Sequence, residues 1–314
     1  LSFNTNVLRY QFSSLITPRS TFDYDMDMKV STLLKQTEVV GGYDLDDYHS
    51  ERLYAEARDG KKVPISIVYK KGYKKNGQGN LLLYAYGSYG STNDPSFSST
   101  RLSILDRGFA YAIAHIRGSQ TYGRPWYEDG KMFNKMNTFT DFVDCSKYLI
   151  ENNYTGSGHL FATGGSAGGL LMGAVVNLAP ELYRGVIAAV PFVDVINTML
   201  DASIPLTSNE WDEWGDPRKK DEYDYMMRYS PYDNVYNADY PNMLVTAGYF
   251  DSQVQYWEPV KWVAKLRDYK VGENILYLHT NMDAGHGGKS GRFRRYKELA
   301  LKYAFILDLA GIKY

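Results

Sequence analysis

Cysteine is almost absent from this chain, which has only Cys145 among its 314 residues. A single cysteine cannot form an intramolecular disulfide, which fits a reducing compartment, and we expect a cytoplasmic protein. Cys145 lies in a segment with a helical pattern, TFTDFVDCSKYLIENN, so we interpret it as a small buried side chain rather than a nucleophile. The lone cysteine and five scattered histidines form no ligand cluster, so the sequence predicts neither a metal nor an organic cofactor.

An excess of charge and a long apolar run are also missing. Lys and Arg number 35 against 36 Asp and Glu, and this balance argues against binding to nucleic acid or to an anionic membrane. No stretch approaches the roughly 18 apolar residues of a membrane span, and the N-terminus lacks the basic start and apolar run of a signal peptide. The first residue is Leu1 rather than Met, so we expect a fragment of a longer protein.

Short apolar runs alternate with helical patterns from about Tyr54 onward, in a chain that is 44% hydrophobic. Several runs are continuously apolar, which is typical of strands covered on both faces. The alternation predicts an α/β fold with a doubly wound, mostly parallel sheet flanked by helices. The predicted strands are 63–69, 81–86, 109–116, 160–163, 186–190, 243–247 and 275–280, and the predicted helices are 138–152, the run after Gly168, 258–269 and about 293–309.

Residues 1–45 differ from the rest of the chain. They are polar and aromatic, with short β-like runs and no repeat. We interpret them as a lead-in, either the end of a β-rich unit or a linker, ahead of an α/β domain that covers residues 46–314.

A serine in a glycine-rich turn is the strongest chemical signal. The predicted strand 160–163 runs into GGSAGG at residues 164–169, and an apolar helical run follows at once. This G-x-S-x-G arrangement between strand and helix is typical of a nucleophile elbow, in which the helix N-terminus faces a developing oxyanion. A glycine-rich turn with a chance serine is the alternative, and a phosphate-binding loop fits poorly because no Gly-Lys-Ser/Thr follows. We predict that Ser166 is the nucleophile of an α/β-hydrolase.

The general base should follow the serine in the chain. Two of the five histidines follow Ser166. His279 lies inside an apolar strand, where a packed or strand-end histidine is expected. His286 lies in a glycine-rich loop after the last strand, from which a general base can reach the nucleophile, so we favour His286.

The acid should lie on the loop after the preceding strand. Asp251 follows MLVTAGYF in that position, where it can orient the His286 imidazole and stabilise its charged form. A helix N-cap is the alternative role for Asp251. Asp268 on a helix face and Asp283 close to His286 are weaker candidates.

Several motifs together resemble one known family. GGSAGG, GYFDSQVQYWEPVKWVAKL and AGHGGKSGR occur with YAYGSYG, RGFAYAIAHIRG, WYEDGK and PYDNV. From about residue 8 to the C-terminus the chain is similar to the oligopeptidase B branch of the prolyl oligopeptidase family. The resemblance implies an α/β-hydrolase catalytic domain that hydrolyses short peptides after Arg or Lys. It also implies a seven-bladed β-propeller ahead of this domain, with residues 1–45 resembling the end of the last blade and the linker.

The resemblance implies further site residues. Tyr86 of YAYGSYG matches the tyrosine that completes the oxyanion hole with the Ala167 N–H, a role that a phenol donor can fill. Glu210 and Asp212 of SNEWDEWG match the carboxylates of the S1 pocket, although a solvated acidic run is the alternative for these two. Asp94 matches a carboxylate on the S2 side.

Two other functions stay open. An esterase or an acylaminoacyl peptidase can use the same fold, because a fold does not set the substrate, but acidic S1 residues argue against an apolar acyl pocket. An inactive binding domain that lacks its propeller is the alternative from another class, and the set of Ser166, Asp251 and His286 argues against it. The expected partners are therefore short basic peptides and an N-terminal propeller.

Overall fold

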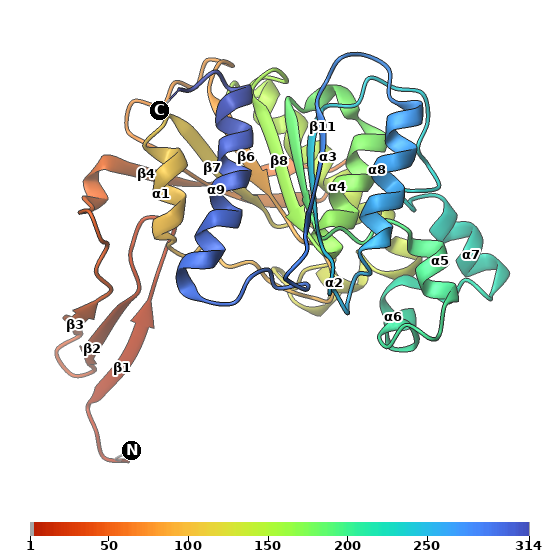
Figure 1. The fold of residues 1–314 in the computed structure, drawn as a ribbon. Coiled ribbons are helices and arrows are strands. Elements are labelled where there is room, and N and C mark those ends of the chain that lie inside the picture. The colour runs from red at the N-terminus through yellow and green to blue at the C-terminus, as the bar shows by residue number, and fades with distance from the viewer. Residues whose placement is uncertain (1–2, 314) are drawn as a thin grey trace.

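The computed structural model describes residues 3–313, apart from the side chain of residue 292. Six neighbouring strands of its main sheet run parallel, and the last two pairings are antiparallel (Figure 1). This arrangement confirms the predicted, mostly parallel α/β sheet. In spatial order the eight strands are β11 (Leu276–Asn281), β10 (Asn242–Gly248), β9 (Gly185–Ala189), β8 (Leu160–Gly165), β6 (Asn80–Tyr84), β7 (Phe109–Ala114), β5 (Lys62–Lys70) and β4 (Tyr48–Glu56).

Helices cover both faces of this sheet (Figure 1). None of the helices within residues 3–313 combines the length and apolar character that crossing a membrane requires. One face carries α1 (Ser99–Leu105) and α9 (Arg292–Leu309), and the other carries α3 (Met136–Glu151), α4 (Ala167–Leu178) and α8 (Trp257–Tyr269). The connections hold α2 (Arg124–Glu128), α5 (Val195–Leu200), α6 (Thr207–Trp214) and α7 (Lys220–Met227), and the 3₁₀ turns η1 (Leu45–Asp47), η2 (Met132–Asn134) and η3 (Pro180–Leu182).

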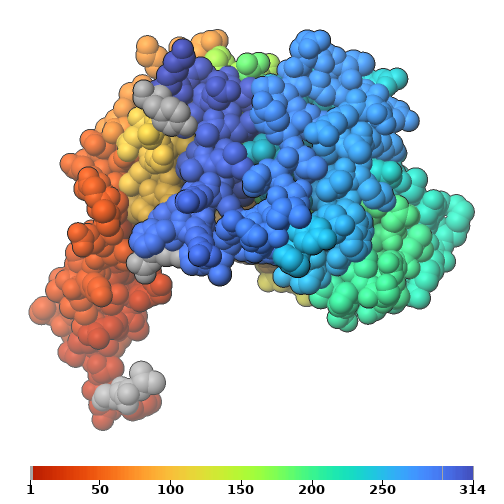
Figure 2. All heavy atoms as spheres, in the orientation of Figure 1, coloured from red at the N-terminus to blue at the C-terminus, as the bar shows by residue number. Residues whose placement is uncertain are grey.

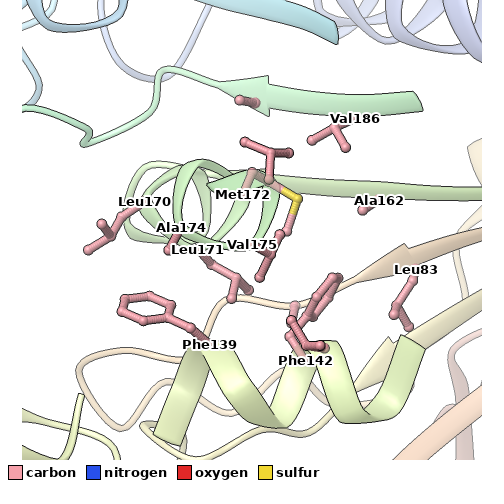
Figure 3. Packing of buried hydrophobic residues seen from close by; sticks show 14 of the residues in the cluster. Leu83, Phe139, Phe142, Ala162, Leu170, Leu171, Met172, Ala174, Val175 and Val186 are labelled. Atoms are coloured by element: carbon pink, nitrogen blue, oxygen red, sulfur yellow. The ribbon is translucent and has the colours of Figure 1, made fainter. Parts of the chain in front are cut away.

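The core consists of two apolar layers, one on each face of the sheet. Successive strand residues point to opposite faces, so Leu82 packs toward Ile306 of α9 whereas Leu83 packs toward Phe142 of α3. Figure 3 shows the second layer, in which Phe139 and Phe142 face the apolar side chains of α4. Packing of α4 against β8, β9 and the neighbouring α3 fixes the helix that begins directly after Ser166.

Residues 3–36 form a small sheet of their own, which contacts the main body through the loop between its first two strands, where Leu15 is buried. β1 (Val7–Phe12), β2 (Ser20–Asp25) and β3 (Val30–Gln36) make a three-stranded antiparallel sheet that stands apart from the main body (Figure 2). Every side chain of β3 is exposed. A sheet of this size has little apolar surface to bury, so it depends on neighbouring structure for stability.

Each predicted strand and helix corresponds to an element of the structure, but several elements are not predicted. β4 is an edge strand in which exposed side chains alternate with half-buried and buried ones, so it lacks a continuous apolar run. The segment 191–241 contains α5, α6 and α7, whose helical patterns are too short and polar to stand out in the sequence. Cys145 is fully buried in α3, as predicted.

Candidate active site

Ser166 lies at a sharp turn between β8 and α4. Its backbone has φ 58° and ψ −120°, a conformation that residues other than glycine rarely adopt. The Ser166 N–H donates to the carbonyl of Ala189 at 2.9 Å, and the Ser166 carbonyl accepts from Phe192 at 3.2 Å. The turn therefore holds a strained serine at the carboxyl edge of the sheet, as a nucleophile elbow requires.

Close packing explains the glycines on both sides of this serine. A Cβ at Gly164 would lie 2.1 Å from the carbonyl oxygen of Gly168, and one at Gly169 would lie 2.4 Å from Cα of Pro191. The Ala167 N–H opens α4, and within the described residues it makes no backbone hydrogen bond. That free donor lies next to Ser166, where an oxyanion can be bound.

Asp251 and His286 meet above the ends of β10 and β11. Oδ2 of Asp251 lies 2.7 Å from Nδ1 of His286, and Oδ1 accepts the backbone N–H groups of Gln253 and Val254 at 2.9 Å each. The Asp251 side chain is 1% exposed. A buried carboxylate that accepts at Nδ1 selects the tautomer in which Nε2 is free to accept a proton.

The structure thus brings the three predicted residues to the same edge of the sheet, after β8, β10 and β11. A main-chain bond from Phe250 to the Ala284 carbonyl, 3.1 Å long, ties the two loops that carry Asp251 and His286. Within residues 3–313 no hydrogen bond joins Ser166 to His286. The alternative role as a helix N-cap does not hold, because Asp251 accepts N–H groups of a turn while α8 begins only at Trp257, with Tyr256 at its N-cap.

The competing candidates lie elsewhere. His279 is in β11, as its sequence indicates, but it is exposed rather than packed because β11 is an edge strand. Asp268 is exposed on α8, and Asp283 is exposed and pairs with Lys289 at 3.2 Å. None of the three contacts the Asp251–His286 pair through a described hydrogen bond.

A cavity of about 190 Å³ opens beside Ser166. Tyr86, just beyond β6, lines it together with Ser166 and Ala167. Burial raises the pKa of the Tyr86 phenol, while the neighbouring Ser166 hydroxyl acts in the opposite direction. The phenol therefore stays protonated at neutral pH and is available as a hydrogen-bond donor on the same side as the Ala167 N–H.

Glu210 of α6 lies in the wall of this cavity. Its Oε2 accepts the Tyr89 hydroxyl at 2.6 Å and the Trp214 indole N–H at 2.9 Å. Phe192 and Met199 add apolar lining nearby. The cavity thus combines one carboxylate with aromatic and aliphatic walls, a composition that suits a long cationic side chain.

Asp212 and Asp94 do not join the cavity. Both are exposed, and neither lines it. Asp212 follows Glu210 by two residues on a helix, which turns it about 200° away from the face that carries Glu210. Glu210 and Asp212 were expected to form a pair of pocket carboxylates, but only Glu210 lines the cavity.

Glu213 is the second carboxylate on that face of α6, and it was not predicted from the sequence. It is 4% exposed and accepts the Tyr89 N–H at 2.8 Å and the Tyr127 hydroxyl. The i, i+3 spacing from Glu210 is the signal that identifies it, once a helix is assumed over SNEWDEW.

Comparison with known proteins shows the family of the chain. The sequence profile described as the prolyl oligopeptidase family matches residues 95–313. The chain belongs to the prolyl oligopeptidase family. Dipeptidyl aminopeptidase BI of Pseudoxanthomonas mexicana is 54% identical over 98% of this chain and 43% of that protein. Protease 2 of Moraxella lacunata is 53% identical over 99% of this chain and 45% of that protein.

Solved structures of family members have the same fold as this chain. Oligopeptidase B from Leishmania major superposes with a TM-score of 0.93 at 45% identity, over 99% of this chain and 43% of that one. Oligopeptidase B from Trypanosoma brucei with covalently bound antipain gives a TM-score of 0.93 at 43% identity, over 100% and 44%. The α/β-hydrolase fold is thereby confirmed. This family member spans less than half the length of the relatives that it matches.

Proposed function

We propose that the chain carries the active site of a serine peptidase that cleaves peptides after Arg or Lys. The observation that carries this proposal is the pair of buried Asp251 and half-buried His286, with Oδ2 and Nδ1 2.7 Å apart, at the same sheet edge as the strained Ser166. Membership in the prolyl oligopeptidase family supports peptide hydrolysis as the reaction class.

Each step of acyl transfer has a suitable group. His286 Nε2 takes the proton of Ser166, whose Oγ attacks the peptide carbonyl. The Tyr86 phenol and the Ala167 N–H donate to the oxyanion of the tetrahedral intermediate. His286 then protonates the leaving amine, and a water molecule hydrolyses the acyl-enzyme with His286 again acting as the base.

The preference for a basic residue rests on Glu210. Within the described residues its Oε2 is occupied by two donors, whereas its Oε1 accepts no hydrogen bond. A substrate ammonium or guanidinium can bind this free oxygen, and the apolar lining from Phe192 and Met199 can pack against the aliphatic stem. An uncharged acyl group would leave the carboxylate without a counter-charge and its Oε1 without a donor, which disfavours an esterase with an apolar pocket.

Residues 1–45 are proposed to be the end of an N-terminal β-propeller and the linker from it. The separate sheet of β1, β2 and β3, with its exposed third strand, supports this assignment. The short span of the chain relative to its relatives supports it too. Such a partner domain would cover the carboxyl edge of the main sheet and limit the size of the substrate.

The test is hydrolysis of chromogenic amides with Arg, Lys, Phe or Pro before the scissile bond. Each amide is used with a free and with a blocked N-terminus, because one relative is named a dipeptidyl aminopeptidase and others oligopeptidase B. Ser166→Ala is compared with Ser157→Ala, a matched change at an exposed position. We expect cleavage after Arg and Lys alone, lost in Ser166→Ala and retained in Ser157→Ala.

Other outcomes have defined meanings. Cleavage after Phe or Pro would overturn the role of Glu210 and leave that of Ser166 intact. Activity that survives in Ser166→Ala would overturn the nucleophile. A folded chain that cleaves none of the amides would favour a domain that is inactive without its propeller.

A further inference from the structure

A buried lysine lies behind the segment that carries Tyr86. Lys135 stands at the junction of η2 and α3 and is 1% exposed. Its Nζ donates to the Gly87 carbonyl at 2.7 Å, to Ser88 Oγ at 2.8 Å and to the Gly130 carbonyl at 3.2 Å. The ammonium therefore has one oxygen acceptor for each of its three protons, and within residues 3–313 it forms no ion pair.

An ammonium in this position is unfavourable for stability. Removing a charge from water without a contacting counter-charge is expensive, and burial lowers the pKa of Lys135 to about 8, against the opposing effect of Glu213. The Trp214 ring, whose centroid lies 4.9 Å from Nζ, offers partial compensation. An apolar side chain of similar length would fill the same space at lower cost, so the reason for a lysine lies in what the ammonium holds.

The residues held by Lys135 belong to an irregular segment. Gly87, Tyr89 and Gly90 have φ values of 76°, 58° and 65°, so three of the four residues after Tyr86 lie in the left-handed region. Neither a helix nor a strand ladder can fix such a backbone, and its conformation depends on contacts from outside. The Glu213 carboxylate accepts the Tyr89 N–H, and the Gly118 carbonyl accepts the Gly90 N–H at 3.0 Å. Lys135 supplies the contact at Ser88 and the shorter of two at the Gly87 carbonyl, to which Thr138 Oγ1 donates at 3.5 Å.

The contact at Gly87 is the one nearest to Tyr86. A Cβ at Gly87 would lie 2.5 Å from Cγ2 of Thr138, so the peptide is pressed against the start of α3. On its other side Tyr86 follows the end of β6 by two residues. Tyr86 thus lies in a short segment between the end of β6 at Tyr84 and the Gly87 peptide that Lys135 binds.

We propose that Lys135 is a positioning residue for the oxyanion hole. Its ammonium fixes the Gly87 carbonyl and the Ser88 hydroxyl, and so holds the Tyr86 phenol beside Ser166. This role rests on the proposed function, in which Tyr86 donates to the oxyanion. Because the phenol helps most when the oxyanion has formed, loss of Lys135 should lower kcat and leave substrate binding almost unchanged.

A double-mutant cycle with Lys135→Met and Tyr86→Phe tests the coupling. Loss of one oxyanion donor typically costs on the order of 100-fold in kcat, so we expect about 100-fold for Tyr86→Phe and about 10-fold for Lys135→Met, with KM within about 2-fold. In the Tyr86→Phe background, Lys135→Met should cost less than about 2-fold, because the group that it positions is gone. Lys131→Met, an equal change of charge four residues earlier, should have no effect. A purely structural role predicts the same loss in both backgrounds, and that result would overturn the proposal.

Two further measurements keep the test decisive. If Lys135→Met does not fold, Ser88→Ala removes one of the three acceptors and should lower kcat about 3-fold, again only when Tyr86 is present. A crystal structure of whichever variant folds should show the Tyr86 phenol displaced from Ser166. An unmoved phenol would refute the role of Lys135 even if the parent chain cleaves no amide, whereas that inactivity by itself would count against the proposed function.

Discussion

The two walls of the cavity beside Ser166 are held by different kinds of contact. The elbow wall is made of main chain, and Gly164 approaches the Gly168 carbonyl so closely that no side chain fits between them. The α6 wall is made of side chains, in which Glu210 accepts hydrogen bonds from Tyr89 and Trp214, while Glu213, outside the cavity lining, accepts the Tyr89 N–H. The elbow should therefore fail when a methyl group is added, and the α6 wall when a charge is lost.

The largest expected effect is at the elbow. In Gly164→Ala the new Cβ would lie 2.1 Å from the Gly168 oxygen, and the backbone can relieve this contact only by moving Ser166 or the Ala167 N–H. A displacement of about 1 Å typically costs on the order of 100-fold in rate, so we expect kcat/KM to fall by at least that factor. Steady-state hydrolysis of the preferred amide measures it.

Gly165→Ala is the matched control for this change. Its Cβ would lie 3.4 Å from the Ala189 oxygen, an ordinary contact distance, so its activity should stay within a few-fold of the parent. Equal losses in the two variants would show that the elbow is sensitive to any added atom. The close contact at Gly164 would then not explain the loss of activity in Gly164→Ala.

A smaller and selective effect is expected at the α6 wall. Glu210→Gln keeps an oxygen for the Tyr89 and Trp214 donors but removes the charge. We expect kcat/KM for Arg and Lys amides to fall about 30-fold, near 2 kcal/mol, because a charge-assisted hydrogen bond is lost. Amides with an uncharged residue should not become worse substrates. Asp212→Asn, which neutralises an exposed carboxylate of the same helix, should change nothing, and a loss there would reinstate Asp212 as a pocket residue.

The contrast between the walls also explains what the sequence could predict. The elbow is encoded within six neighbouring residues, since the small side chains that it needs are adjacent in GGSAGG. The order of strands then places Asp251 and His286 at the same edge, because parallel strands end together. Local pattern and topology were thus enough to predict that Ser166, Asp251 and His286 lie at the same edge of the sheet.

The α6 wall depends on contacts between distant parts of the chain. Tyr89 and Glu210 are 121 residues apart, and Tyr89 and Glu213 are 124 apart. A single sequence carries no local trace of the pairing with Tyr89. Asp212 was assigned from the resemblance, whereas the helical i, i+3 spacing from Glu210 would have indicated Glu213. The same limit hid Lys135, whose burial follows only from the packing of η2 and α3 against the Tyr86 segment.

A further effect, on stability rather than on activity, concerns the attachment of the segment 191–241 to the main body. Glu258 of α8 is fully buried and accepts the N–H groups of Val193 and Asp194 at 3.1 Å each and the Thr198 hydroxyl at 2.6 Å. Burial, as the dominant cause, raises the pKa of Glu258 from its ordinary 4.5 to about 7. A raised carboxyl pKa means that the folded state binds the proton more tightly than the unfolded state does. The stability from this group is therefore complete below pH 4.5 and is lost as the pH rises to about 7.

Glu258→Gln should remove this dependence. The amide can keep its oxygen on the two backbone N–H groups and donate its NH₂ to Thr198, as the protonated acid would, so the variant should match the parent near pH 4.5. Above pH 7 it should be more stable than the parent by on the order of 3 kcal/mol, from 2.5 units of pKa shift at 1.36 kcal/mol each. Urea unfolding at pH 4.5, 6, 7 and 8 measures the difference, which cancels the titration of all other groups. A difference in stability that is constant across this pH range would mean that Glu258 stays charged when buried. The segment 191–241 would then be attached to α8 through an ionised carboxylate.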